Sequence, residues 1–165
     1  MQIIFLSKGQ TLFLFFLLWP LFQVSAALLC YYLPDRFFDP NAFWYRSHPF
    51  EQGGRIYAKW FKIKRWKQWL PDGGAVFKRK GFRKKHLKET SWSYFNQFLI
   101  ESCRAELTHW LAILPFWIFG FFAGPGVVGV MLGYALLVNV PCILVQRFNR
   151  PRIKAMMGRM EKSEG

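Results

Sequence analysis

Formal charge is missing from a long stretch in the second half of this chain. Between Trp110 and Gln146 the sequence has no Asp, Glu, Lys or Arg, and its one sharp break is Gly124-Pro125-Gly126. A membrane-spanning helix needs about 20 consecutive apolar residues, so this stretch is long enough for two helices joined by a turn. It therefore predicts a transmembrane hairpin with arms at about Leu107 to Ala123 and Val127 to Val145.

Cysteines and familiar short motifs are scarce as well. Cys30, Cys103 and Cys142 have no metal-ligand spacing, so we expect no metal, no cofactor and no disulfide framework. An acyl-enzyme on Cys142 is one interpretation of that thiol, and a small apolar filler in a membrane helix is the other. The H-x4-D acyltransferase box is absent, because no Asp stands five positions after any of the three histidines.

Acidic residues are few, with 9 Asp and Glu against 23 Lys and Arg. No zinc-finger spacing, RNP-like string or glycine-rich phosphate loop accompanies the positive charge, which argues against nucleic acid as a partner. We expect anionic membrane lipids instead, attracted by about 1 kcal/mol per basic residue near the surface. One cation precedes the first apolar run, 16 lie between Arg36 and Arg104, six lie between Arg147 and Lys162, and none lies in the hairpin turn. The positive-inside rule therefore predicts a multi-pass membrane protein with its basic loop and C-terminus in the cytoplasm.

The first apolar run, Thr11 to Leu33, is long enough to span a bilayer. Two interpretations stay open. A cleaved signal peptide fits Lys8 before the run and the small residues Val24 to Ala27. A retained anchor fits the length of the run and the positive-inside rule better, because cleavage would place the basic C-terminus outside.

These features predict a mainly α, small integral membrane protein. We divide it into an N-terminal membrane anchor or signal-like segment (1–33), a basic and aromatic cytoplasmic or interfacial region (34–90), and a C-terminal part (91–165). That last part holds an amphipathic helix, the transmembrane hairpin and a basic tail. Tyr57 to Leu70 mixes cations with tryptophans, as expected of a helix in the headgroup layer or of a membrane-hugging linker. Pro71 to Gly74 predicts a turn, and Lys78 to Lys88 a solvated loop.

The amphipathic helix is expected to begin near Ser91 or Ser93 and to run through Trp110. At about 100° per residue, one face somewhat wider than half the helix carries Glu101, Arg104, Glu106 and His109. A carboxylate three residues from a histidine can fix its tautomer and raise its basicity, as a general base near neutral pH requires. The plain alternative is an interfacial helix whose charges are only solvated.

The opposing arm carries its own polar residues. Asn139 sits inside an apolar run just before Pro141, and its amide is either a link between helices or a ligand-binding group. Counted outward from the turn, His109 lies about level with Pro141, so two runs of polar residues are expected to meet near one membrane face. Amide and guanidinium donors suit a sugar hydroxyl, a thioester oxygen or a phosphate. The donors after Pro141 are Gln146, Arg147, Asn149, Arg150 and Arg152.

Two stretches, RAELTHWLAILP and YALLVNVPCILVQRFNRPR, closely resemble the glycosyl-4,4'-diaponeurosporenoate acyltransferase family of bacteria. That family catalyses the last step of staphyloxanthin-type carotenoid synthesis. The resemblance extends upstream to KWFKIKRWKQWLPDGG and covers most of the chain after Leu33. The family pattern E-T-[KR]-R-A-E corresponds here to Glu101-Ser102-Cys103-Arg104-Ala105-Glu106, in which the cation of the pattern is missing at Cys103.

The resemblance implies an acyltransferase that esterifies the glucose C6'' hydroxyl of a carotenoid glycoside with a branched fatty acyl chain. The implied partners are the glycosylated carotenoid acceptor and a fatty acyl thioester donor, either coenzyme A or a carrier protein, at the bacterial cell membrane. We predict His109 as general base, with Glu106 or Glu101 orienting it. The predicted substrate-binding residues are Arg104, Asn139, Gln146, Arg147, Asn149, Arg150 and Arg152.

Two other functions stay open at this point. The chain could be a non-enzymatic scaffold or assembly factor that binds anionic lipid, which explains the charge but not the polar residues at two helix ends. It could also acylate another glycolipid.

Overall fold

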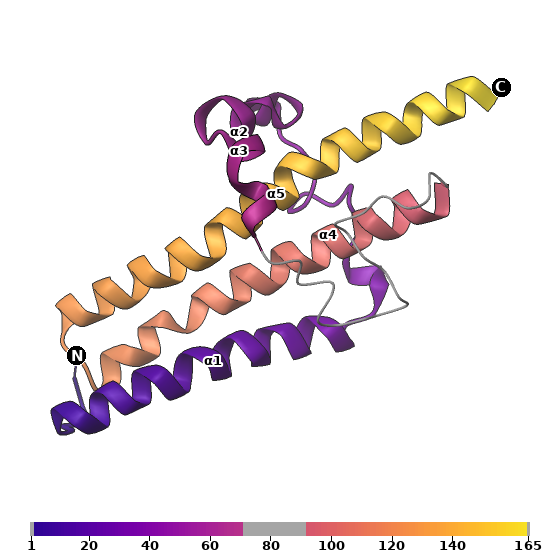
Figure 1. Ribbon diagram of the computed structural model, residues 1–165. Coiled ribbons are helices and arrows are strands. Elements are labelled where there is room, and N and C mark those ends of the chain that lie inside the picture. The colour runs from indigo at the N-terminus through magenta and orange to yellow at the C-terminus, as the bar shows by residue number, and fades with distance from the viewer. Residues whose placement is uncertain (1, 71–91, 165) are drawn as a thin grey trace. The chain divides into compact units, whose positions relative to one another are not determined.

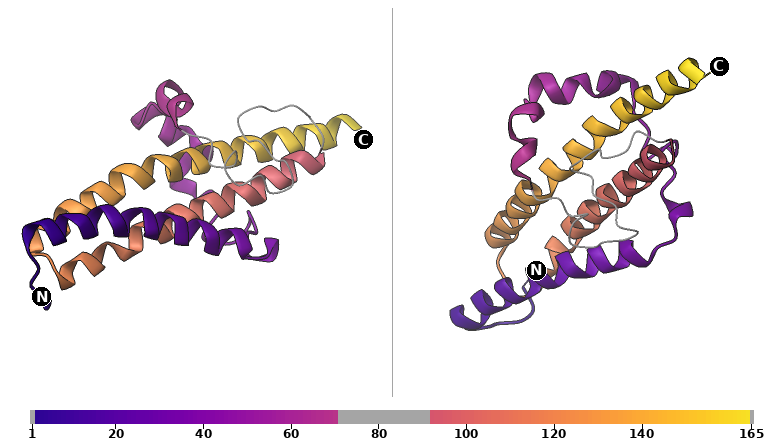
Figure 2. Two further views of the ribbon diagram at one scale, coloured as in Figure 1. Left: turned by 60° about the horizontal axis from the view of Figure 1, so that its bottom comes forward. Right: turned by 45° about the vertical axis from the view of Figure 1, so that its right-hand side comes forward.

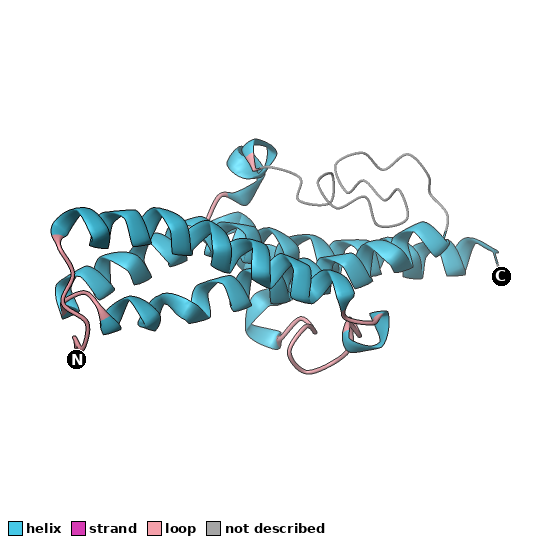
Figure 3. Cartoon of the chain, turned by 90° about the horizontal axis from the view of Figure 1, so that it is seen from below, coloured by secondary structure: helices cyan, strands magenta, loops and turns pink. Residues whose placement is uncertain are grey.

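Helices joined by short loops make up the part of the chain that the computed structural model describes, residues 2–70 and 92–164 (Figure 3). No strand is present in these residues, as expected for the mainly α class. Contacts divide the chain into two units. Unit 1 is Met1–Tyr32 with Leu107–Pro141, and unit 2 is Leu33–Glu106 with Cys142–Gly165. These units cut across the three predicted segments, because two long helices each contribute residues to both.

Unit 1 is built from three helical stretches that lie side by side (Figure 1). The first is α1 (Lys8–Tyr32), the second is the end of α4 (Trp92–Ile113) with the 3-10 helix η6 (Leu114–Phe121), and the third is the first half of α5 (Pro125–Glu164). The predicted first span is thus confirmed as a helix that begins three residues earlier and ends one earlier. Gly124 accepts backbone hydrogen bonds from Val127 and Val128 at 3.0 and 3.2 Å, so α5 begins directly after the predicted turn.

Aromatic rings hold unit 1 together. Trp19 of α1 packs against Phe119 of η6 and Tyr134 of α5, with ring centroids 5.1 and 5.2 Å apart. Phe15 adds an edge contact with Phe119 at 5.4 Å. Such pairs contribute about 0.5 to 1.5 kcal/mol beyond the burial of their area. Just before α1 begins, the backbone N–H groups of Ile3 and Ile4 both donate to the carbonyl of Phe121 at 2.8 Å.

The outer surface of unit 1 is apolar. Only 11% of the apolar window of α1 and 17% of that of α5 is buried in the protein, and both helices are long and apolar enough to cross a membrane. A core helix of a soluble protein would be mostly buried, whereas these helices expose large side chains such as Phe16 and Leu137 at 75% each. Exposed apolar surface of this extent indicates association with lipid.

The first arm of the predicted hairpin differs from expectation. A single helix over Leu107 to Ala123 is wrong, because the α-helix ends at Ile113 and continues as η6. Pro115 lies at the start of this change. A proline has no N–H to donate and disfavours α geometry in the residue before it, so the helix changes there from α to the tighter 3-10 geometry. Among the described residues, two helices rather than three meet the length and composition of a membrane span.

Unit 2 consists of short helices packed on the two long ones. These are η1 (Asp35–Phe37), η2 (Pro49–Gly54), α2 (Arg55–Trp60), α3 (Ile63–Trp66) and η3 (Lys67–Trp69). The first turns of α4 pack along the last turns of α5 through a cluster of buried apolar side chains. Its members are Phe95, Phe98, Leu99, Ile153 and Met157.

The short helices α2 and α3 lie beside α5 (Figure 2). Tyr57 and Ile63 form a second buried cluster with Phe148 of α5. The chain comes very close to α5 at Gly54, which has a φ of +86°. A Cβ there would lie 3.1 Å from the carbonyl oxygen of Phe148, so this contact requires glycine both for its conformation and for space.

Two further expectations need correction. The single interfacial helix over Tyr57 to Leu70 is wrong, because Lys62 adopts a left-handed φ of +49° and separates α2 from α3. The residues after Val145 form the continuation of α5 to Glu164, since Phe148, Ile153 and Met157 give this stretch an apolar face to pack. The predicted turn at Pro71 and the loop at Lys78 to Lys88 lie outside the described residues.

Candidate active site

His109 and Asn139 meet in unit 1. The Nδ1 atom of the histidine lies 2.9 Å from Oδ1 of the asparagine. His109 is half-buried, whereas Asn139 is 0% exposed. The hairpin therefore has nearly the predicted register, with the histidine opposite a residue two positions before Pro141.

The second bond of the asparagine amide fixes the chemistry of this pair. Asn139 donates from Nδ2 to the carbonyl oxygen of Ala135 at 2.9 Å, so its oxygen faces the histidine. An amide oxygen only accepts, which means that His109 carries its proton on Nδ1. Nε2 is then the basic nitrogen, in the tautomer that a general base needs.

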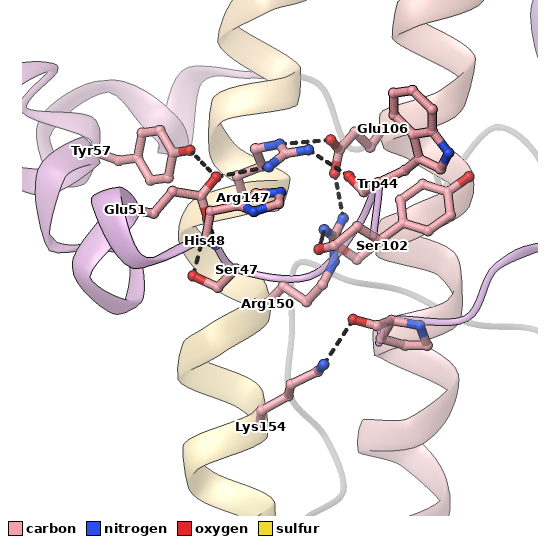
Figure 4. Close-up of polar contacts among 12 residues, drawn as sticks. Trp44, Ser47, His48, Glu51, Tyr57, Ser102, Glu106, Arg147, Arg150 and Lys154 are labelled. Atoms are coloured by element: carbon pink, nitrogen blue, oxygen red, sulfur yellow. Dashed lines mark hydrogen bonds and ion pairs between the residues drawn. The ribbon is translucent and has the colours of Figure 1, made fainter. Parts of the chain in front are cut away.

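Glu106 lies at the centre of a buried ionic network in unit 2 (Figure 4). Its Oε1 accepts from Nε of Arg147 and its Oε2 from Nη2 of Arg150, each at 2.7 Å. Glu106 is 1% exposed, so the alternative in which the charges of this helix are only solvated does not apply to it. Ser102, one turn earlier on α4, also accepts from Arg150 at 3.3 Å.

Glu51 of η2 is the second carboxylate of the network. It accepts from Nη1 of Arg147 and from the Tyr57 hydroxyl at 2.7 Å each, and from the Ser47 hydroxyl at 3.0 Å. Burial alone would raise the pKa of this carboxyl, yet these hydrogen bonds and the Arg147 charge lower it below its usual value. Burial and the neighbouring Glu51 charge raise the pKa of Tyr57. Glu51 is therefore ionised and Tyr57 neutral over the physiological range.

The two arginines also hold the loop that precedes η2. Arg147 donates to the carbonyl of Trp44 at 2.6 Å, and Arg150 donates to the carbonyl of Tyr45. Two consecutive backbone carbonyls are thus bound by guanidinium groups that share Glu106. Within the described residues, Nε of Arg150 is the one buried side-chain nitrogen or oxygen that has no hydrogen-bond partner.

A separate set of contacts surrounds Arg104. It forms an ion pair with Asp35, donates to the carbonyl of Leu33 at 2.9 Å, and lies 3.3 Å from Glu101. Its guanidinium also stacks over the Phe38 ring at 4.2 Å. These contacts attach the start of the basic region to α4.

The hydrogen bonds and ion pairs of the predicted site residues only partly match their predicted roles. Glu106 and Glu101 pair with arginines, and the orienting role predicted for them stays a prediction. The substrate contacts predicted for Arg104, Arg147 and Arg150 also stay predictions, because each of these guanidinium groups is bound to carboxylates and carbonyls. Three other predicted substrate-binding residues make fewer contacts with the described residues.

Three predicted substrate-binding residues lie outside the network. Asn149 accepts from Lys67 at 3.5 Å, and Arg152 stacks on the Phe148 ring at 4.7 Å. Gln146 is half-buried, and its side chain has no recorded hydrogen bond to the described residues. Their predicted substrate contacts stay predictions.

The sequence interpretation missed Glu51, Tyr57 and Ser102. Glu51 is the one acidic residue between Asp39 and Asp72, and an isolated acid among so many cations is a signal that could have been used. No group of three or more His, Cys, Asp or Glu side chains that could hold a metal ion occurs in the described part of the chain.

Comparison with known proteins gives a match that includes the residues of the candidate site. A family profile described as glycosyl-4,4'-diaponeurosporenoate acyltransferase matches residues 41–159. A glycosyl-4,4'-diaponeurosporenoate acyltransferase of Staphylococcus aureus strain MRSA252 is 36% identical over 149 residues, which is 90% of this chain and 88% of that protein. The protein of the same name from strain Newman is 34% identical over 157 residues, covering 94% and 93%. No solved structure matches the chain significantly.

Proposed function

The chain belongs to the glycosyl-4,4'-diaponeurosporenoate acyltransferase family, and we propose that it esterifies the glucose C6'' hydroxyl of glycosyl-4,4'-diaponeurosporenoate with a branched fatty acyl chain. The donor is an acyl thioester of coenzyme A or of a carrier protein. Membership in a family of acyltransferases removes the non-enzymatic scaffold from consideration. The observation that carries the chemical part of the proposal is the His109–Asn139 pair.

In this proposal, Nε2 of His109 takes the proton of the sugar hydroxyl. The hydroxyl oxygen then attacks the thioester carbonyl carbon, the tetrahedral intermediate collapses, and the thiolate leaves with the proton returned by the histidine. General base catalysis of this kind contributes about 10² to 10⁴ in rate. Asn139 acts as a positioning residue that holds the Nδ1–H tautomer. Because it is fully buried, this role replaces the direct substrate contact predicted for it.

The surroundings of the pair suit an amphiphilic acceptor. Unit 1 exposes apolar side chains along α1 and the first half of α5, as a polyene chain in the bilayer would require. A glycosylated carotenoid has its sugar at the membrane surface and its tail in hydrocarbon. A polar pair in the unit that carries these exposed apolar helices is where such a sugar hydroxyl can meet a base.

Pigment analysis of cells with and without the gene tests the proposed reaction. We expect loss of the gene to leave unesterified glycosyl carotenoid, and the wild-type gene to restore the ester. A gene carrying His109→Ala should restore nothing although its product reaches the membrane. If loss of the gene leaves the carotenoid ester unchanged but removes an acylated glycolipid, the acceptor is that glycolipid instead.

We also propose that the C-terminal end of α5 is cytoplasmic and that the turn at Gly124 lies outside, from the distribution of cations. The test uses a chain in which the three native cysteines are Ser. An impermeant thiol reagent added to intact cells should label Gly126→Cys but not Lys162→Cys. The reverse pattern contradicts the proposed orientation.

A further inference from the structure

Two cations of unit 2 share one aromatic ring. The ammonium nitrogen of Lys67 in η3 lies 5.3 Å from the ring centre of Phe148, and the guanidinium carbon of Arg152 lies 4.7 Å from the same centre. Phe148 is only 2% exposed, so the ring is a fixed platform held by α2 and α3. Both cations therefore lie against a ring that the packing of the unit holds in place, Lys67 half-buried and Arg152 exposed.

These cations have no acidic neighbour in the described chain. Among residues 2–70 and 92–164, no carboxylate forms an ion pair with Lys64, Lys67 or Arg152. The contact of Lys67 with Asn149, at 3.5 Å, is with a neutral amide. Burial, followed by the positive charges of Arg152 and Lys64, lowers the pKa of Lys67.

This arrangement contrasts with Arg104 and with the two arginines of the buried network. Arg104, Arg147 and Arg150 each pair with at least one carboxylate. Like charges held close together without a counterion repel one another, and an anion bound between them relieves that repulsion. A fixed cluster of this kind favours an anion with several acceptor oxygens, because both a guanidinium and an ammonium group can donate to it.

We propose that Lys67 and Arg152 form a binding site for a phosphate ester. Two molecules present that chemistry to this protein: coenzyme A, through its 3'-phosphate and pyrophosphate, and a phosphatidylglycerol headgroup. The coenzyme A case rests on the proposed acyl transfer, whereas the lipid case does not. Equilibrium binding of coenzyme A without an acyl group tests the phosphate site independently of the proposed reaction.

The test uses the full-length protein in phosphatidylcholine nanodiscs. Binding of coenzyme A is titrated by calorimetry, and binding of phosphatidylglycerol is measured by its enrichment around the protein at low molar fraction. The variant Lys67→Gln with Arg152→Gln removes two charges from the cluster. Its matched control, Arg159→Gln with Lys162→Gln, removes two charges from exposed positions further along α5.

We expect the cluster variant to weaken binding of at least one probe by roughly tenfold or more, the effect of losing a charge-assisted hydrogen bond. The control should stay within about twofold of wild type, because Arg159 and Lys162 lie further along α5 than the ring that Lys67 and Arg152 share. Exchange of the two cations, Lys67→Arg with Arg152→Lys, should retain binding. Loss of coenzyme A binding identifies a donor site, and loss of lipid enrichment identifies a headgroup site.

The proposal is overturned if neither probe binds, or if the cluster variant and the control weaken binding equally. For this comparison, the cluster variant and the control must both keep the thermal stability of the wild type. If the cluster variant does not, the variant with Lys67→Arg and Arg152→Lys provides a folded reference. Repeating the titration with His109→Ala keeps the outcome independent of turnover, so a failed acyltransferase assignment and a failed phosphate site give different results.

Discussion

The buried polar side chains of unit 1 and unit 2 differ in charge and in the number of their partners. In unit 1, a neutral asparagine and a histidine lie in apolar surroundings, joined by one bond of 2.9 Å. In unit 2, two carboxylates and two arginines form a network in which both oxygens of Glu106 are bound by guanidinium groups. In both arrangements the buried amide and carboxylate groups are hydrogen-bonded, and Nε of Arg150 is the exception among the described buried side-chain nitrogens and oxygens.

The difference indicates which arrangement is suited to chemistry. A general base must change its protonation state during each turnover, and a neutral imidazole oriented by an amide can do so at little electrostatic cost. Protonating Glu106 would leave the buried Arg150 without its carboxylate partner and Arg147 with Glu51 alone, which costs several kcal/mol. We therefore propose His109 as the catalytic base with Asn139 as its positioning residue, and we propose that the network attaches η2 and the Trp44 loop.

The largest effect is expected from removing a charge at the centre of the network. Glu106→Gln leaves Arg147 and Arg150 partly uncompensated in a buried place. Breaking such a pair costs about 3 to 5 kcal/mol, so this variant should unfold at a much lower temperature in detergent. Glu101→Gln is the matched control on the same helix, and we expect a loss of less than about 1 kcal/mol from its more exposed ion pair.

A Glu106→Gln protein with wild-type thermal stability and no turnover would reverse the assignment. The network would then take part in the reaction rather than in holding the chain.

The next effect concerns turnover alone. His109→Ala should lower the rate of ester formation by roughly 10²-fold or more, the contribution of a general base, while the melting temperature stays close to that of the wild type. His48→Ala is the control, because His48 stacks on Phe50 in unit 2 and has no part in the proposed reaction. Near-normal product from His109→Gln would rule out the base.

A smaller effect separates positioning from simple helix packing at Asn139. Asn139→Leu should change stability by only about 0.6 kcal/mol, the average for hydrogen bonds between membrane helices. Turnover should fall by about tenfold, a part of the base contribution, because nothing then selects the Nδ1–H tautomer. Cys142→Ala, on the same helix, should keep full turnover, and a large loss there would instead support an acyl-enzyme. An Asn139→Leu protein that is destabilised but fully active per folded molecule would leave this residue structural.

The helices and the hairpin register could be predicted from the sequence, because they follow from local rules. An uncharged run with Gly-Pro-Gly in its middle admits few arrangements, and counting residues outward from the turn placed His109 opposite the region of Asn139. The interruption at Pro115 was available from the same rules but was overlooked. The helical continuation after Val145 was not predicted, because its apolar face is visible only once α4 is known to pack on it.

The partners of the charged residues could not be predicted. Residues three apart on a helix suggested that Glu106 meets His109, yet arginines 41 and 44 residues away occupy the oxygens of Glu106. Glu51 reaches Arg147, and Tyr57 reaches Glu51, in a segment that Gly54 allows to come close to Phe148. Such contacts depend on tertiary packing, which local periodicity does not determine.

The smallest effect is a change in how stability depends on pH, and it tests whether Glu51 is part of the network in solution. The pKa of Glu51 in the folded protein lies below its ordinary value of 4.5, because its hydrogen bonds and the Arg147 charge outweigh the effect of burial. A lowered pKa contributes stability that is fully present above the unfolded value and is lost as the pH falls through the folded value. The wild-type melting temperature should therefore decline as the pH is lowered below about 4.5, the pKa of the carboxyl in the unfolded chain. Glu51→Gln should start from a lower melting temperature at neutral pH and decline less on acidification.

Asp39→Asn, a control at an exposed position, should leave the acid decline of the wild type in place. Parallel declines for the wild type and Glu51→Gln would show that Glu51 does not contribute through its charge, and the network would then depend on Glu106 alone.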